Sequence, residues 1–224
     1  MELIKLKDNI YYSPHEEKRD RPVLGYIRGK RYSVMVDAGA SAAHISSFYS
    51  ALSCAGLPMP EYTAITHWHW DHTFGMCAVE GKTIAHVNTQ PKLMEMRCSD
   101  DVFSYGDERM RVEYSDAKDI SIILPNILFD GNLVLNLGDI SCHIISIPSP
   151  HSDDASAIWI PEGRALFLGD ATSPDYFNGG VYDAGELHKM AAWLEDRDFD
   201  VCLLGHSAPL SKAELMEYLH SLME

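Results

Sequence analysis

Short apolar runs separated by polar turn residues dominate the N-terminal part of the chain. Their spacing predicts short β-strands at residues 1–8, 10–12, 23–28, 32–36, 62–66 and 83–87. Apolar residues at helical spacing predict one helix in this part, over 42–54, which ends near Gly56 and Pro58. The N-terminal half therefore has a β-rich pattern with one internal helix.

The pattern changes at residues 89–119, where Met, charged and aromatic residues follow no clean period. We expect a helical lid or insertion there. Strand-like runs return from Ile127 and continue at residues 132–137, 141–147, 155–160, 165–168 and 201–204. Capping-box patterns at 183–186 and 211–214 each predict the start of a helix. This order, strands then helix repeated twice, indicates two β-rich layers covered by helices in a single domain over 1–224.

Composition and charge narrow the class of partners. The chain has 46% hydrophobic and 23% charged residues, as globular proteins do, and 18 basic against 33 acidic residues give a net charge of −15. Without a dense basic cluster, such an acidic chain is not expected to bind nucleic acid. No apolar run approaches the roughly 18 to 20 residues that span a membrane, so no membrane partner is expected.

The termini and the cysteines indicate the compartment. The N-terminus has no basic segment followed by an apolar block, so we expect no secretory signal. The cysteine number is odd, no CxxC pair occurs, and the positions are scattered: Cys54, Cys77, Cys98, Cys142 and Cys202. We therefore expect reduced thiols in a cytoplasmic protein.

Four side chains of metal-ligand type follow the strand predicted at 62–66. The run reads His67-Trp68-His69-Trp70-Asp71-His72. In an extended segment alternate side chains share a face, so His67 and His69 are expected to point the same way and the tryptophans to the opposite side. Imidazole and carboxylate are ligands that zinc accepts.

Three further candidates stand at the ends of predicted strands. His151 follows the run 141–147, Asp170 follows 165–168, and His206 follows 201–204. An earlier strand ends in the same way at Asp37. Strand ends are rigid platforms whose loops can gather at one edge of a sheet, so we expect a metal site at that edge.

Taken in chain order, these motifs closely resemble the metallo-β-lactamase superfamily of metallohydrolases. The resemblance implies an α+β fold, a four-layer αββα sandwich with the metal site at one edge between the sheets. It also implies that His67, His69 and His151 hold a first divalent metal and that Asp71, His72 and His206 hold a second. By the same resemblance, Asp170 bridges the two metals, and Asp37 orients ligands without binding metal.

The ligand set implies the chemistry. Two divalent ions about 3.5–4 Å apart can share a water and lower its pKa from about 15.7 towards neutrality. The expected nucleophile is this metal-bridging hydroxide, and Asp71 is expected to orient it and to pass a proton to the leaving group. We expect a dinuclear metal-dependent hydrolase, with zinc as the first choice of metal; iron and manganese fit the same ligands.

The expected substrate is a small-molecule ester, lactone or thioester. The alternative is an iron-dependent oxidoreductase of the same fold, either a diiron enzyme or a persulfide dioxygenase with one iron. His69 argues against the diiron branch, whose members commonly have Glu at this position, whereas the ligands leave the one-iron branch open. A non-catalytic metal-binding module is disfavoured because no ligand is missing.

Residues around the ligands offer weaker signals about the substrate. Tyr176, Asn178 and Tyr182 lie in the loop after Asp170 and are candidates to contact a substrate oxygen. Asp153 and Asp154 follow His151 where many relatives read Thr-Pro-Gly, and they are expected to disfavour strongly anionic substrates. The oligomeric state is left open.

Overall fold

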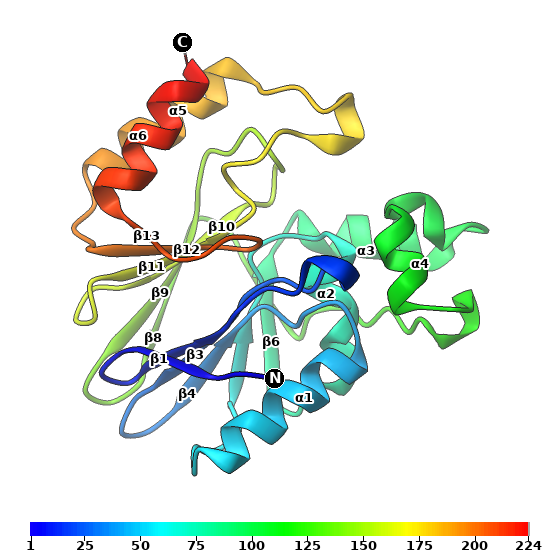
Figure 1. Ribbon diagram of the computed structural model, residues 1–224, viewed down its shortest axis with the longest axis horizontal. Helices are drawn as coiled ribbons and strands as arrows, with labels where there is room; N and C mark the ends of the chain where they lie inside the picture. The colour runs from blue at the N-terminus through cyan, green and yellow to red at the C-terminus, as the bar shows by residue number, and fades with distance from the viewer. Residues whose placement is uncertain (224) are drawn as a thin grey trace.

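Two mixed β-sheets face each other, and helices cover their outer faces (Figure 1). The computed structural model describes residues 1–223. Its layers follow the order helix, sheet, sheet, helix, which confirms the α+β, αββα architecture. No helix among residues 1–223 is long and apolar enough to cross a membrane.

The first sheet has seven strands in sequential order. They are β1 (Ile4–Lys7), β2 (Ile10–Ser13), β3 (Leu24–Arg28), β4 (Ser33–Val36), β5 (Tyr62–Ala64), β6 (Lys82–His86) and β7 (Ile127–Phe129). The strands from β1 to β4 pair antiparallel, and those from β4 to β7 pair parallel. Because parallel strands end at the same edge, the chain leaves β4 and β5 on one side of the molecule.

The second sheet has six strands in the order β13-β12-β11-β10-β9-β8. They are β8 (Asn132–Asn136), β9 (Ser141–Ser146), β10 (Ser156–Ile160), β11 (Ala165–Gly169), β12 (Val201–Leu204) and β13 (Leu210–Ser211). Strands β11 and β12 are parallel, and the other neighbours are antiparallel. The loops after β11 and β12 therefore leave from the same edge.

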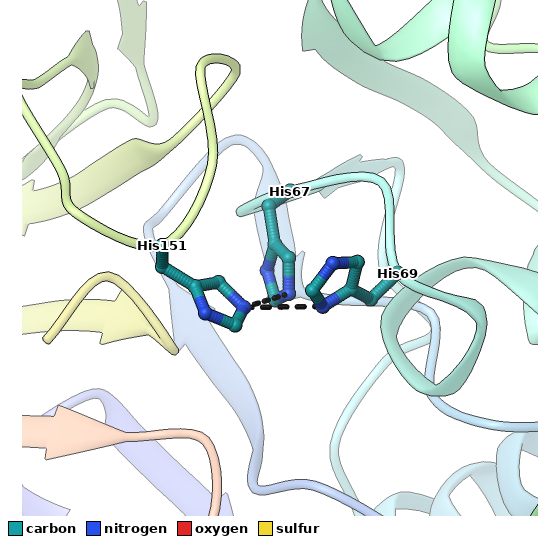
Figure 2. A group of neighbouring side chains, drawn as sticks. All are labelled: His67, His69 and His151. Atoms are coloured by element: carbon teal, nitrogen blue, oxygen red, sulfur yellow. Dashed lines mark hydrogen bonds between the residues drawn. The ribbon is translucent and has the colours of Figure 1, made fainter. Parts of the chain in front are cut away.

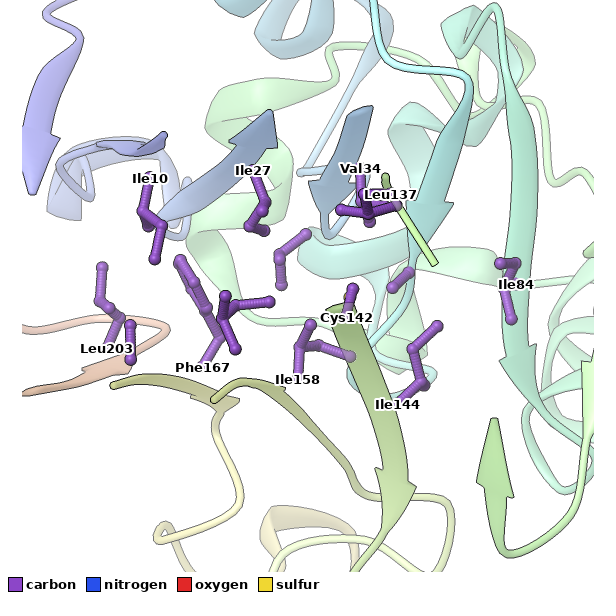
Figure 3. Close-up of a cluster of buried hydrophobic side chains, with 14 of the residues drawn as sticks. Ile10, Ile27, Val34, Ile84, Leu137, Cys142, Ile144, Ile158, Phe167 and Leu203 are labelled. Atoms are coloured by element: carbon purple, nitrogen blue, oxygen red, sulfur yellow. The ribbon is translucent and has the colours of Figure 1, made fainter. Parts of the chain in front are cut away.

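The main core lies between the two sheets (Figure 3). Ile27 and Val34 of the first sheet face this layer, as do Ile158 and Phe167 of the second. Gly25 has a packing reason to lack a side chain, because a Cβ there would lie 2.5 Å from the Phe167 ring. Burial of branched and aromatic side chains on both inner faces fixes how the two sheets meet.

Separate apolar clusters attach the outer helices. Helix α1 (Ala42–Cys54) packs through Ile45 and Phe48 on the first sheet, while α5 (Ala184–Glu195) and α6 (Lys212–Met223) pack on the second. Both predicted capping boxes start helices: Asp183 accepts a hydrogen bond from the Glu186 amide, and Ser211 and Glu214 bond reciprocally. Figure 1 shows α5 and α6 together on one side of the sandwich and α1 on the other.

Residues 89–119 are helical, in short pieces. They form α3 (Thr89–Cys98), η3 (Val102–Tyr105), α4 (Glu108–Glu113) and η4 (Ala117–Asp119). Leu93, Met96 and Met110 are buried in one apolar cluster with Trp70 and Phe74. The segment is thus packed beside the loop that carries the histidine run.

Candidate metal centre

Three imidazoles converge from two loops at the edge of the sandwich. The Nε2 atom of His151 lies 3.3 Å from Nε2 of His67 and 3.1 Å from Nδ1 of His69 (Figure 2). All three side chains are buried, and one ligand atom from each lies within 4.8 Å of the others. These residues form the first cluster.

The hydrogen bonds behind the first cluster fix which nitrogen carries the proton. Nδ1 of His151 lies 2.8 Å from the carbonyl oxygen of Pro174, which can only accept, so Nδ1 donates and Nε2 presents its lone pair. Nδ1 of His67 faces the Thr66 hydroxyl at 3.2 Å, and that hydroxyl donates to Asp37. His67 therefore also turns an unprotonated Nε2 inward, as a metal ligand requires.

Burial favours the neutral form of two of these imidazoles, His67 and His69. Burial, with the neighbouring His72 adding to it, holds the pKa of His67 well below its ordinary value. Burial and the nearby His151 lower the pKa of His69 to about 3. Neutral imidazoles can present lone pairs to a cation bound between them.

The second cluster adjoins the first and is mixed in charge. It consists of Asp71, His72, Asp170 and His206. Oδ2 of Asp71 lies 3.0 Å from Nε2 of His206 and 3.2 Å from Nε2 of His72. The His67 and His72 rings lie 4.2 Å apart, so the two clusters are in contact.

Nε2 of His72 is buried and makes no well-oriented hydrogen bond among the described residues, although Asp71 Oδ2 lies 3.2 Å and Asp170 Oδ1 3.6 Å from it. The other nitrogen of the ring is bonded to Asp37 at 2.8 Å. A cation between this nitrogen and the two carboxylates would satisfy all three groups. The residues therefore fit a metal at both clusters.

Protons occupy the second cluster when no cation is bound. Burial lowers the pKa of His72, but Asp71 and Asp37 outweigh it and raise the pKa well above its ordinary value. Burial likewise opposes the charge on His206, yet Asp170 and Asp71 raise its pKa to about 10. A metal must displace these protons, so binding here is coupled to pH.

Asp37 is linked by hydrogen bonds to both clusters, directly to His72 and through Thr66 to His67. Its carboxylate accepts from the Thr66 amide at 2.7 Å, from the Thr66 hydroxyl and from His72 Nδ1. The residue has a left-handed backbone, with φ of 62°, which aspartate tolerates better than most side chains. It touches ligand-type residues and is not itself in a cluster.

Residues of both clusters line a cavity of about 630 Å³. His69, Asp71, Asp170 and His206 line it together with residues of η3, α4 and the loop after β11. Of the three expected substrate contacts, Tyr176 lines this cavity. Within the described chain Asn178 and Tyr182 lie outside the lining: Asn178 bonds to Asp175, and Tyr182 packs against the core beneath α5 and α6.

The expectation about Asp153 and Asp154 needs correction. The Asp154 side chain is fully buried and accepts from the hydroxyls of Thr89 and Ser152, so it connects the loop of His151 to α3. Asp153 is exposed, and neither carboxylate lines the cavity. The carboxylates of Asp153 and Asp154 therefore do not face a substrate in the cavity.

The histidine run also differs from an extended strand. Strand β5 ends at Ala64, and α2 (Trp70–Thr73) starts directly after His69. Trp68 is not on the opposite side of the chain, because its ring lies 4.5 Å from that of His69. His67 and His69 do point toward the same site, as expected, with ring centroids 4.6 Å apart.

Sequence reasoning missed the cavity residues that lie far from the motifs. Asp20 is buried, with Oδ1 3.6 Å from Nδ1 of His206 and 2.7 Å from a guanidinium nitrogen of Arg109. Tyr105 and Phe177 also line the cavity. These residues stand outside any metal-ligand motif, so the sequence offered no signal that would place them at the site.

Two facing sheets with histidine and aspartate clusters at their shared edge define a metallohydrolase-like fold. The family model of the metallo-beta-lactamase superfamily matches residues 24–206, and the chain belongs to this superfamily. Members of the superfamily typically bind divalent metals, and they include metal-dependent hydrolases.

Solved structures support the fold. A metallo-beta-lactamase from Cronobacter sakazakii with substitutions in its HARLDQ motif is 16% identical, with a TM-score of 0.75 over 99% of this chain and 94% of that one. A metallo-beta-lactamase from Pontibacter korlensis is 17% identical, with a TM-score of 0.69 over 100% and 99%. The stereoselective inverting sec-alkylsulfatase from Pseudomonas sp. is 14% identical, with a TM-score of 0.69 over 99% of this chain and 40% of that one. A search of the curated proteins found no match.

Proposed function

We propose that the protein is a dinuclear metal-dependent hydrolase of a small ester, lactone or thioester. The observation that carries this proposal is the pair of adjoining ligand clusters, each of which contributes residues to the lining of one cavity. His67, His69 and His151 would hold one ion, and Asp71, His72 and His206 the other, with Asp170 between them. Zinc is the first choice because imidazole and carboxylate suit it.

When bound, two divalent ions activate water as a nucleophile and polarise the oxygen under attack. The chain's own residues prepare this step. Asp37 holds His72 and, through Thr66, His67 in the orientation that turns a lone pair inward.

Asp71 is the residue that we assign to proton transfer. Its Oδ2 atom is engaged by His72 and His206, whereas Oδ1 takes part in none of the hydrogen bonds among residues 1–223. Oδ1 can therefore take up a proton and pass it to the leaving group.

The test is elemental analysis of the purified protein beside a panel of esters, lactones and thioesters. We expect about two zinc or manganese ions per chain and turnover of at least one substrate class. His67→Ala and Asp170→Ala should each lose metal and activity, while His143→Ala, which changes a histidine outside both clusters, should lose neither.

Other outcomes would contradict the proposal. One iron per chain with persulfide-dependent oxygen uptake would indicate the dioxygenase instead. Two bound metals without hydrolysis of any of the three classes would contradict the proposed substrates. Circular dichroism of each variant separates loss of metal from loss of fold.

A further inference from the structure

Aromatic side chains from two distant segments form one wall of the cavity. Tyr105 ends η3, and Phe177 lies in η5 (Tyr176–Asn178) after β11. Their ring centroids are 6.4 Å apart, and Phe177 lies 4.8 Å from the Trp68 ring and 5.1 Å from that of His69. Tyr105 and Phe177 line the cavity and define the aromatic wall, while Trp68 packs against both rings without lining the cavity. The aromatic wall lies directly beside the first cluster.

Local bonds hold this wall in place although its rings are partly exposed. Asp175 accepts hydrogen bonds from the amides of Phe177 and Asn178 at 2.9 and 3.1 Å, which fixes the turn that presents Phe177. The Tyr105 hydroxyl donates to Glu95 at 3.1 Å. Phe177 is nevertheless 47% exposed, so apolar ring surface faces solvent at the mouth of the cavity.

Charged side chains line another part of the cavity. Arg109 is paired with Asp20 and Asp107 at 2.7 and 2.8 Å, and Asp20 lies behind His206 of the second cluster. The cavity is therefore apolar beside His69 and polar beside His206. A bound molecule that has one apolar end and one polar end has a single favourable orientation in it.

We propose that the aromatic wall is a subsite for an aryl-sized apolar group of the substrate, next to the bond that reacts. This inference rests on the proposed function, because the ligand clusters set where that bond lies. Covering exposed aromatic surface with an apolar group is favourable in proportion to the area removed from water. The substrate is then an ester, lactone or thioester with a phenyl-sized group near its carbonyl carbon, rather than an acetyl compound.

The experiment compares two carboxylic acids that differ only in this group. Phenylacetate and acetate are titrated into the purified protein, with the metal it carries, by NMR. We expect wild type to prefer phenylacetate by about tenfold or more. Phe177→Ala and Tyr105→Ala should reduce this ratio to below about threefold, and Phe177→Leu should retain most of it by restoring apolar area.

The matched control is Tyr32→Ala. Tyr32 is a similarly exposed tyrosine, 38% accessible, in the turn between β3 and β4, and its replacement should leave the ratio unchanged. Equal affinities in wild type, or an unchanged ratio in Phe177→Ala, would overturn the subsite. A retained preference in a protein that hydrolyses no ester would instead contradict the proposed reaction and leave the subsite standing.

Discussion

Asp37 shows how far one side chain controls the candidate centre. Its carboxylate accepts from three donors, two on Thr66 and one on His72. An Asn at this position keeps the left-handed backbone, but its amide NH₂ would face one of these donors. Residues that hold a metal-binding histidine in place commonly contribute 10–100-fold to metal affinity.

We therefore expect Asp37→Asn to weaken zinc binding by roughly 10–100-fold, chiefly at the second cluster. Competition with a chromophoric chelator measures the affinity of each ion. Asp139→Asn, in the turn before β9, is the matched control and should bind zinc as wild type does. Unchanged zinc affinity in Asp37→Asn would show that the carboxylate does not orient His72.

The buried carboxyl of Asp154 should make the free energy of unfolding depend on pH. Burial raises its pKa from 3.8 to about 6, so between about pH 4 and 6 the native chain holds a proton that the unfolded chain has lost. Stability from this group is thus fully present below about pH 4 and is lost as the pH rises through about 6. Asp154→Asn stays neutral and should gain up to about 3 kcal/mol relative to wild type between pH 4 and 7.

Urea denaturation at several pH values, in EDTA so that cations do not contribute, measures this difference. Asp153→Asn, the exposed neighbour, should show a much smaller pH-dependent gain. A constant difference between Asp154→Asn and wild type across the range would mean that Asp154 titrates normally.

Among the secondary-structure elements, a buried ion pair anchors α4. The side chain of Glu113, at the end of α4, is only 1% exposed and pairs at 2.8 Å with Arg21, which follows η1 (Glu17–Arg19). It also accepts from Ser41, the N-cap of α1. One carboxylate thus holds three elements together beside the cavity.

Removal of this carboxylate leaves the buried Arg21 guanidinium with only its longer contact to the half-exposed Glu16, at 3.5 Å. We expect Glu113→Ala to lower the free energy of unfolding by about 3–5 kcal/mol. Glu108→Ala, on the exposed face at the start of α4, should change it by no more than about 0.5 kcal/mol. Equilibrium urea unfolding measures both variants. Equal losses in the free energy of unfolding would contradict the anchoring role of Glu113.

Prediction from sequence was most accurate for elements with local causes. The helix over 42–54 and the starts of α5 and α6 follow from capping side chains within a few residues. The predicted extended path of residues 65–69 was wrong in the direction of Trp68. The turn into α2 depends on burial of Trp70 and Phe74 against residues 89–119. That contact joins segments that no local pattern relates.

At the scale of the whole molecule, the candidate ligands come from both halves. His67, His69, Asp71 and His72 follow the first sheet, while His151, Asp170 and His206 follow the second. Bound cations would therefore cross-link the halves at one edge. A cation at about 1,000 times its dissociation constant stabilises a fold by about 4 kcal/mol.

Chelation should thus lower the midpoint of thermal unfolding by several degrees, and added zinc should restore it. Scanning calorimetry with and without EDTA measures the shift. EDTA should lower the midpoint of His143→Ala as much as that of wild type, and it should lower the midpoint of His67→Ala less. A midpoint unaffected by EDTA in a zinc-containing sample would show that the ions do not join the halves.

The sequence by itself determined which residue types stand at the ends of which strands, and hence the family and the candidate ligands. Ligand spacing and strand patterns are local, so they can be read along the chain. Only the tertiary structure decided which donors share a cluster, that Asp154 turns inward, and that Tyr105 meets Phe177 across the cavity. These contacts join residues tens of positions apart, and their geometry depends on how the two sheets and residues 89–119 pack.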